Sequence, residues 1–229
     1  MNFDCLSGQQ GPLLVQYWAH GDPPPLLAAR MRQWHVCNPA WTYRCFDRLS
    51  AADVLRAAWG GDLALAFLDI RLPAMQADVF RVAVTLLCGG LWVDAATTCL
   101  VPLSAWLESQ ASLVLLRKPK MEPPLVWNGF IYAAQAQHPF LQAAWDQIAQ
   151  VIRCRTGTGI WKLVGPGLYR DLLRDPCYHE GVQIVDSSVY GVGLSIGSSA
   201  EVLPIEQHWS KRQRQESLYF SRPFSSPSA

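Results

Sequence analysis

The distribution of hydrophobic and polar positions predicts strands and helices in alternation. The apolar run "PLLVQYWA" at 12–19 is rich in β-favouring residues, has turn residues on both sides and predicts a buried strand. Residues 26–36 repeat apolar positions with the period of a helix, which Asn38-Pro39 ends. The aromatic, alternating run "WTYRCF" at 41–46 predicts a second strand. The chain is therefore expected to begin as a strand, a helix and a strand.

The rest of the chain continues this alternation. Ser50 followed by Asp53 predicts a capping box for a helix that runs to Trp59 and stops at Gly60-Gly61. Further helices are expected at 73–88, 139–152 and 165–173, and further strands at 91–96, 112–117, 125–134, 182–185 and 202–205. Strands that alternate with helices favour an α/β sheet covered by helices on both faces.

The helix expected at 73–88 is nearly free of charge. Asp78 and Arg81 are its only charged side chains, and most of the others are Ala, Val, Leu, Met and Phe. Such a helix is buried, and an ionised group in it is unfavourable unless it is paired or faces a polar cavity. The i, i+3 spacing places the two charges on one face. They form either a structural ion pair or the floor of a binding site.

The next element brings a third charge to the same region. Gly89-Gly90 ends the helix, and the apolar strand that follows carries Asp94 near its end. Ligands of open α/β sheets bind in crevices at the carboxyl ends of strands. We therefore expect Asp78, Arg81 and Asp94 to surround one crevice, which favours the binding site over the purely structural pair.

Composition and charge exclude several classes of protein. The 229 residues are 50% hydrophobic and 16% charged, which suits one domain with a large core. A net charge of +1 gives no electrostatic reason to expect nucleic acid as a partner. No apolar run approaches the roughly 18 residues of a transmembrane span. The seven cysteines lack C-x-x-C spacing, which argues against a disulfide framework and a zinc knuckle. No signal peptide is visible, so we expect a cytoplasmic location, with peripheral association at the inner membrane as the alternative.

The segment "LPAMQADVFRVAVTLLCGGLWVDAATTCLVPL" at 72–103 resembles the sugar-binding core of glycosyltransferase family 32. This family includes yeast mannosyltransferases, bacterial capsule and lipooligosaccharide transferases and, more distantly, the clostridial glucosylating toxins. Its pattern has an acid and an arginine in a helix, a Gly-Gly turn, a D-x-D pair of acids and an L-x-P-L tail. The matching positions here are Ala77-Asp78, Arg81, Gly89-Gly90, Asp94 and Val101-Pro102-Leu103.

Weaker matches to the same family flank this core. They are "VQYWAHGDPPP" at 15–25, "NPAWTYRCFD" at 38–47, "NGFIYAAQAQHPFL" at 128–141, "VGPGLY" at 164–169 and His208-Trp209. The resemblance implies a GT-A fold, in which a mixed, Rossmann-like sheet lies between helices and holds a nucleotide-sugar cleft at its strand ends. We expect an N-terminal extension at 1–11, a single GT-A domain at 12–210 and a C-terminal tail at 211–229.

The resemblance also implies roles for individual residues. Asp78 and Arg81 correspond to the acid and arginine that bond to hydroxyls of the donor sugar. Asp94 corresponds to the first acid of D-x-D, which bonds to ribose or sugar hydroxyls and helps to hold a metal ion. Trp18 corresponds to a tryptophan that borders the nucleotide base. Two weaker donor-site candidates, with a bulge and a plain turn as their alternative roles, are Asn128 and Gly165.

The second acid of D-x-D falls at Ala96, which departs from the family pattern. In GT-A enzymes that acid usually binds Mn²⁺ or Mg²⁺, which bridges the two phosphates of the donor. Thr97 and Thr98 are neutral and therefore weaker ligands for such a cation. The candidate metal ligands that remain are Asp94 and His208, with a surface or capping role as the alternative for the histidine.

Ala96 leaves three possibilities open. Asp94, water and the diphosphate hold the metal by themselves; or catalysis is free of metal, with a cation such as Arg81 or Lys162 covering the phosphates; or the donor is bound without turnover. The leading hypothesis is a hexosyltransferase that uses a UDP- or GDP-sugar and, by family likeness, retains the anomeric configuration. Its acceptor is a glycan, a lipid-linked glycan or a protein. The alternative is a catalytically degenerate protein that binds a nucleotide sugar or glycan, or an accessory subunit of the same fold.

Overall fold

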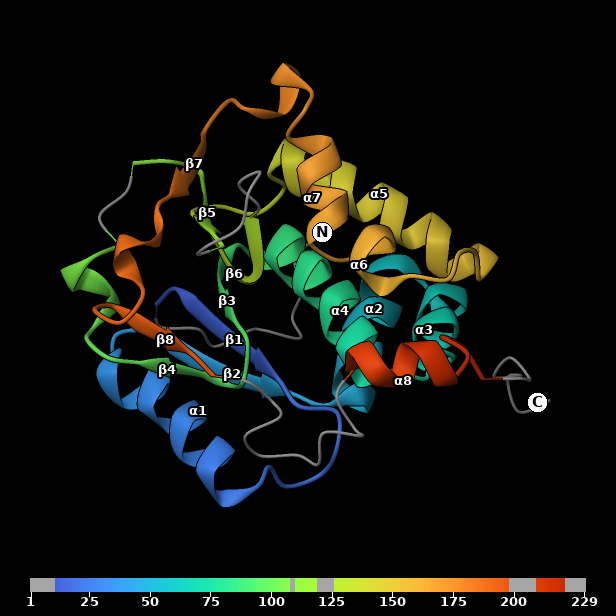
Figure 1. Ribbon diagram of the computed structural model, residues 1–229, viewed down its shortest axis with the longest axis horizontal. Coiled ribbons are helices and arrows are strands. Elements are labelled where there is room, and N and C mark those ends of the chain that lie inside the picture. The colour runs from blue at the N-terminus through green and yellow to red at the C-terminus, as the bar shows by residue number, and fades with distance from the viewer. Residues whose placement is uncertain (1–10, 108–109, 119–125, 198–208, 221–229) are drawn as a thin grey trace.

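The short apolar runs of the chain form one six-stranded mixed sheet with the order β2-β1-β3-β6-β5-β7 (Figure 1). The computed structural model describes residues 11–107, 110–118, 126–197 and 209–220. β1 is parallel to β2 and β3, β6 is antiparallel to β3 and β5, and β7 is parallel to β5. The strands of this sheet are β1 (Leu13–Tyr17), β2 (Thr42–Phe46), β3 (Gly90–Val93), β5 (Leu113–Arg117), β6 (Val126–Ala133) and β7 (Val182–Val185).

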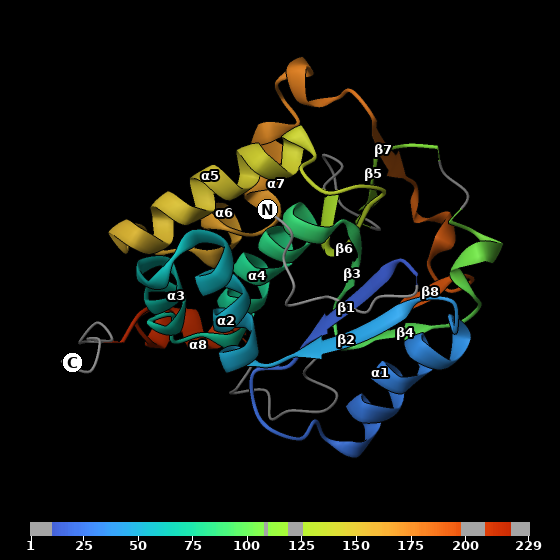
Figure 2. The same cartoon turned by 180° about the vertical axis from the view of Figure 1, so that it is seen from behind.

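Helices cover both faces of the sheet. One face carries a group of helices around α4, whereas α1 lies on the other face, as the two opposite views show (Figures 1 and 2). The helices are α1 (Pro25–Cys37), α2 (Arg48–Trp59), α3 (Gly61–Leu68), α4 (Pro73–Cys88), α5 (Pro139–Cys154), α6 (Ile160–Leu163), α7 (Pro166–Leu172) and α8 (Trp209–Gln215). The α/β sheet with helices on both faces, expected from the sequence, is therefore confirmed.

The alternation of side chains along β1 divides the interior into two cores. Leu13, Val15 and Tyr17 point into the core that α2 to α5 and α7 close. Leu14 points the other way, into a core that contains Trp34 of α1. Successive side chains of a strand point to opposite faces of its sheet, so a strand buried on both faces reads as a continuous apolar run.

The structure corrects the helix start that was placed at Ser50. The capping box is formed by Asp47 and Ser50, whose side chains each accept a hydrogen bond from the other's backbone N–H, so α2 begins at Arg48. Asp47, rather than Ser50, is the N-cap residue, because its carboxylate accepts a hydrogen bond from the N–H of Ser50 at 2.8 Å.

The structure also contains elements that the sequence did not indicate. A second, two-stranded sheet pairs β4 (Thr97–Cys99) with β8 (Leu194–Ile196), and α3 begins directly after the Gly60 stop of α2. Strands of this length carry too few residues for a periodic pattern. Short 3-10 turns occur at Leu103–Ala105, Pro176–Tyr178 and Ser187–Val189. The strand expected at 202–205 lies outside the described residues. Among the helices that the structure describes, none is long and apolar enough to span a bilayer.

Candidate functional site

Asp78 and Arg81 lie on the buried side of α4, as their spacing predicts. α4 runs over the whole segment from Pro73 to Cys88, and its side chains are buried almost all round. The Asp78 side chain is 12% exposed and that of Arg81 only 4%. Two ionisable groups are thus buried where α4 packs against the apolar core, and an unpaired charge there would be strongly unfavourable.

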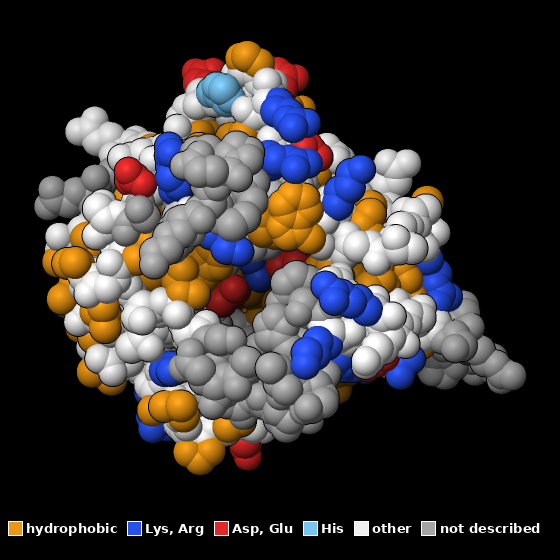
Figure 3. All heavy atoms as spheres, viewed as in Figure 1, with side chains coloured by type: hydrophobic (Ala, Val, Ile, Leu, Met, Phe, Trp, Pro, Cys, Tyr) orange, Lys and Arg blue, Asp and Glu red, His pale blue; other side chains and the backbone are white. Residues whose placement is uncertain are grey.

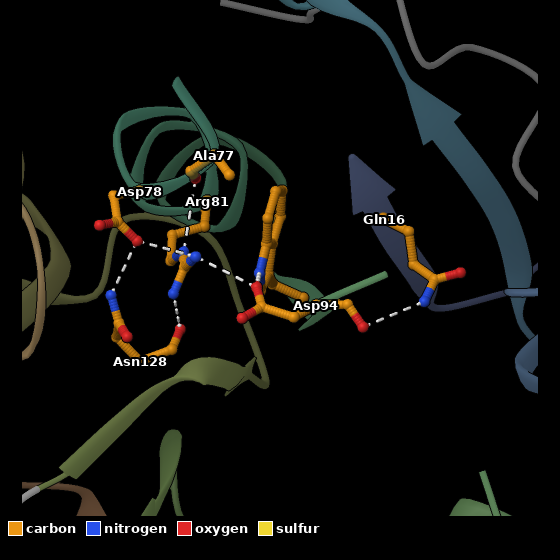
Figure 4. A network of polar contacts seen from close by, with 7 residues as sticks. Gln16, Ala77, Asp78, Arg81, Asp94 and Asn128 are labelled. Carbon is orange, nitrogen blue, oxygen red and sulfur yellow. Dashed lines mark hydrogen bonds and ion pairs between the residues drawn. The ribbon is translucent and has the colours of Figure 1, made fainter. Parts of the chain in front are cut away.

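Arg81 is the centre of the polar network that satisfies these charges (Figure 4). Its Nη2 lies 2.8 Å from Oδ1 of Asp78 and 3.1 Å from Oδ1 of Asp94, and its Nη1 donates to the backbone carbonyl of Asn128. The Asn128 amide donates to Oδ1 of Asp78 at 2.9 Å. Oδ1 of each carboxylate is therefore engaged, whereas Oδ2 of each accepts no hydrogen bond that the described residues show.

Asp94 is held where β3 ends and the chain turns. Its backbone N–H donates to Gly129 at 2.9 Å, its carbonyl accepts from Thr97 at 2.9 Å, and its Oδ1 also accepts from the Trp92 indole at 3.0 Å. A third of its side chain, 33%, is exposed. Asp94 is thus fixed by backbone and side-chain bonds, but its carboxylate reaches the surface of a cavity.

Burial and charge shift the pKa values of this group. Burial raises the pKa of Asp78 to about 7, although Arg81 acts to lower it. Burial would lower the pKa of Arg81, but Asp94 and Asp78 outweigh it and raise that pKa above its ordinary value. Arg81 therefore stays charged, while Asp78 changes its charge near neutral pH.

These side chains lie at the wall of a cavity of about 690 Å³. The cavity is bounded by the first half of α4, the carboxyl ends of β1 and β3, the start of β6, β8 and α8. The space-filling view shows acidic side chains inside a hollow, with Lys and Arg side chains beside them (Figure 3). The position at the ends of β1 and β3 is the one that ligands occupy in open α/β sheets.

Only some of the other expected site residues line this cavity. Trp18 and Asn128 line the same cavity as Asp78, Arg81 and Asp94. Gly165 does not line it, although the next residue, Pro166, does. Lys162 is exposed and lies outside the lining. His208 lies outside the described residues.

Two buried polar atoms of the lining lack a partner within the described parts of the chain. They are the hydroxyl of Thr97 and the indole Nε1 of Trp18. Buried polar groups of folded proteins are almost always hydrogen-bonded, and an unsatisfied one is unfavourable by about 1–3 kcal/mol. A ligand could satisfy either atom only if its side chain turned toward the cavity. The sequence had indicated Thr97 only as a weak ligand for a cation, because its short polar pair with Thr98 carries no further signal.

Lys118 and Arg212 are cationic lining residues that the sequence did not indicate. Lys118 directly follows β5, and Arg212 lies on α8, far from the motif segment 72–103. Neither has a diagnostic spacing from Asp78 or Asp94. Only the fold brings them to the cavity.

The described residues offer few ligands for a divalent cation at the cavity. They contain no group of three His, Cys, Asp or Glu side chains close enough to hold a metal ion. Asp94 is the one carboxylate at the D-x-D position, and its Oδ1 is already shared by Arg81 and Trp92. Mn²⁺ and Mg²⁺ require several oxygen ligands, and Ala96 offers none from its side chain.

The chain is similar in sequence to proteins of carbohydrate synthesis. Residues 71–153 match a family described as capsular polysaccharide synthesis protein. The chain is 21% identical over 174 residues to the initiation-specific alpha-1,6-mannosyltransferase of Schizosaccharomyces pombe, a match that covers 63% of this chain and 43% of the relative. The chain thus spans less than half the length of that curated relative.

A solved structure is similar to most of the fold. The PaToxG glycosyltransferase superposes with a TM-score of 0.57 and 11% identity, covering 72% of this chain and 69% of that one. At this identity the likeness concerns the fold. The mixed sheet between helices is a GT-A fold, and the resemblance to glycosyltransferase family 32 is confirmed.

Proposed function

We propose that this chain is a glycosyltransferase that moves a hexose from a nucleotide-diphosphate sugar to a hydroxyl acceptor with retention of configuration. The observation that carries the proposal is the buried network of Asp78, Arg81 and Asp94 at the wall of the 690 Å³ cavity. Asp78 and Asp94 both line that cavity, whereas Asp69 of the buried pair with Arg155 does not. The similarity to an alpha-1,6-mannosyltransferase and to a glycosyltransferase fold supports the same class of reaction.

In this proposal the network binds the donor sugar. Oδ2 of Asp78 and Oδ2 of Asp94 accept hydrogen bonds from sugar or ribose hydroxyls, and Arg81 holds both carboxylates in place. Asn128 also fixes Asp78, because its amide donates to the same Oδ1 that Arg81 contacts. Trp18 borders the nucleotide base and offers its free indole N–H. Gly165 takes no part in lining the cavity and contributes at most through the position of Pro166.

The transfer itself needs no nucleophile from the protein. The bond between the anomeric carbon and the diphosphate oxygen breaks, and the acceptor hydroxyl oxygen bonds to the same face of that carbon. The proton of the acceptor hydroxyl passes to the departing diphosphate. The protein contributes by orienting the donor and by stabilising the charge that develops on the diphosphate. The acceptor is a glycan, a lipid-linked glycan or a protein hydroxyl.

Release of nucleoside diphosphate from a panel of UDP- and GDP-sugars, with and without Mn²⁺, tests the proposal. Asp78→Asn should lower the rate about 10- to 150-fold, because a hydrogen bond to a charged group contributes about 1.5–3 kcal/mol. Asp69→Asn is the matched control, since Asp69 is also buried and arginine-paired but does not line the cavity. An Asp78→Asn variant with wild-type turnover would reject the role of the network.

Ala96 favours a second candidate, a protein that binds a nucleotide sugar without turning it over. Position 96 lacks the acid of the D-x-D pattern, and the described residues form no metal-binding group. Ala96→Asp separates the two functions. A large gain of Mn²⁺-dependent turnover in this variant over an inactive wild type would favour the binding protein. Turnover by the wild type, with little gain in the variant, would favour the transferase.

A further inference from the structure

Position 96 has an environment that suits an apolar side chain and opposes a metal ion. Ala96 packs with Trp18, Leu27 and Met31 in a small apolar cluster at the cavity wall. Its carbonyl accepts a hydrogen bond from Nη1 of Arg30 at 3.4 Å. A guanidinium therefore lies beside the place where the missing acid would help to hold a divalent cation, and like charges repel at this range.

The charge of Asp94 is already balanced within the protein. Its Oδ1 lies 3.1 Å from the Arg81 guanidinium, and Arg81 is almost wholly buried. Its Oδ1 also accepts a hydrogen bond from Trp92, at 3.0 Å. A carboxylate that is bound to a buried arginine attracts a second cation less than a free one does. The electrostatic role of the metal must therefore come from elsewhere if a diphosphate binds here.

Lys118 and Arg212 lie where they can take that role. Both line the cavity that Asp94 and Ala96 line. Lys118 is exposed, and none of the described residues forms a hydrogen bond or ion pair with its ammonium group. Arg212 is held in a two-bond pair with Glu216, in which Nε and Nη2 lie 2.9 and 3.0 Å from the carboxylate oxygens. This pair uses one edge of the guanidinium, orients it and leaves Nη1 for another acceptor.

The charges of the cavity as a whole favour an anion. Arg81, Lys118 and Arg212 are cationic lining residues, whereas Asp78 and Asp94 are the lining carboxylates. Glu216, the partner of Arg212, is shared with a second cation, Arg71, so it balances the charge of Arg212 only in part. Burial keeps a part of Asp78 protonated near neutral pH, which increases the positive balance. A cleft with such a balance attracts phosphate groups without help from a bound metal.

We propose that Lys118 and Arg212 bind the diphosphate of the donor directly, and that this chain binds its donor without a divalent cation. The inference rests on the proposed function, because it concerns the donor of that same site. Lys118 contributes a mobile point charge, and Arg212 contributes a fixed guanidinium. Both stabilise the diphosphate as it leaves the sugar.

Titration calorimetry of the full chain with UDP and with GDP, in EDTA and in Mn²⁺, tests the inference. We expect the dissociation constant of the preferred nucleotide to agree within about twofold between the two conditions. Lys118→Ala and Arg212→Ala should each weaken binding about tenfold or more, as loss of a charge-assisted hydrogen bond does. The matched controls are Lys211→Ala and Arg214→Ala, exposed cations of α8 that do not line the cavity.

Charge-preserving variants separate charge from folding. Lys118→Arg should keep most of the affinity, whereas Arg212→Lys should recover only a part of it, because lysine keeps the charge but not the two-bond pair with Glu216. Unfolding curves should show that all variants remain folded. Protein alone should leave the electron paramagnetic resonance spectrum of free Mn²⁺ unchanged, and protein added to Mn²⁺ and nucleotide should give no signal beyond those of the free ion and the Mn²⁺–nucleotide complex. Loss of affinity in the alanine variants with recovery in these variants supports the inference.

The failures are distinguishable. Binding of UDP or GDP that appears only with Mn²⁺, or that is lost in His208→Ala together with a bound Mn²⁺ signal, would overturn the inference and leave the proposed function standing. Failure of every UDP- and GDP-sugar to bind or react under either condition would remove the proposed function itself. Equal affinity in Lys118→Ala, Arg212→Ala and the α8 controls would overturn the assignment of these two residues.

Discussion

Two buried pairs of aspartate and arginine in this protein differ in which partner is buried. In the first, Arg81 is the deeper member, at 4% exposure against 12% for Asp78. In the second, Asp69 is the deeper member, at 3% exposure against 32% for Arg155, and Nε of Arg155 lies 3.0 Å from Oδ2 of Asp69. The first pair faces the cavity, and the second does not line it.

The second pair joins segments that are distant in the sequence. Arg155 ends α5 and lies over the ring of Tyr219, whose hydroxyl donates to the carbonyl of Val151. Tyr219 also forms a bridge to Ile70, next to Asp69. This pair therefore ties the end of α3, the end of α5 and the C-terminal segment together. The comparison shows that burial and pairing of an acid do not by themselves indicate a binding site. The distinguishing feature of the first pair is that its carboxylate lines a cavity.

Removal of the two arginines should separate the pairs most strongly. Arg81→Ala leaves Asp78 and Asp94 buried together without a cation, which should lower the free energy of unfolding by about 3–5 kcal/mol. Arg155→Ala should lower the free energy of unfolding by less, about 1–3 kcal/mol, because Arg155 is partly exposed and Arg48 also interacts with the Asp69 carboxylate. Urea denaturation measures both. Equal losses would contradict the difference drawn here.

The pH dependence of stability should identify Asp78. Burial raises its pKa from an ordinary value of 3.8 to about 7, so the folded state keeps a proton that the unfolded state releases. The stability contributed by this group is full below its unfolded pKa and is lost as the pH rises through about 7. Asp78→Asn cannot ionise, and the decline in the unfolding midpoint between about pH 5 and about pH 8 should therefore be smaller in this variant.

Thermal unfolding over this pH range measures the effect. Each kcal/mol corresponds to about 2–4 °C for a protein of this size. Asp53→Asn is the control, because Asp53 lies on an exposed part of α2 and its side chain is 68% exposed. A variant profile for Asp78→Asn that is parallel to the wild-type profile would show that Asp78 ionises normally in the folded protein.

The sequence was sufficient for the first pair because its charges are close along the chain. Asp78 and Arg81 stand on an otherwise apolar helix, and Asp94 follows on the next strand, so local rules placed all three at one crevice. The helix from Pro73 to Cys88 was predicted to the residue because Pro at its start and Gly89 at its end are strong signals.

Contacts between distant segments gave no such signal. Asp69 and Arg155 come from different helices, and Lys118 and Arg212 reach the cavity only through the fold. The pairing of β4 with β8 depends on segments of three residues, which carry no periodicity. These features depend on tertiary packing, which hydrophobic patterns along one segment do not encode.

The smallest expected effect comes from two glycines, one near Asp94 and one in the helix before Asp69. A Cβ at Gly129 would overlap the Trp127 indole and Oδ2 of Asp94, whereas no heavy atom of the described residues lies within 4 Å of a Cβ at Gly61, which opens the helix that leads to Asp69. Gly129→Ala should therefore lower stability by about 1–3 kcal/mol and weaken donor binding, because Asp94 must move. Gly61→Ala should change stability by less than about 0.5 kcal/mol and leave binding intact. Calorimetric titration with the preferred nucleotide, beside urea denaturation, measures both effects. Unchanged affinity in Gly129→Ala would mean that the position of the Asp94 carboxylate does not govern donor binding.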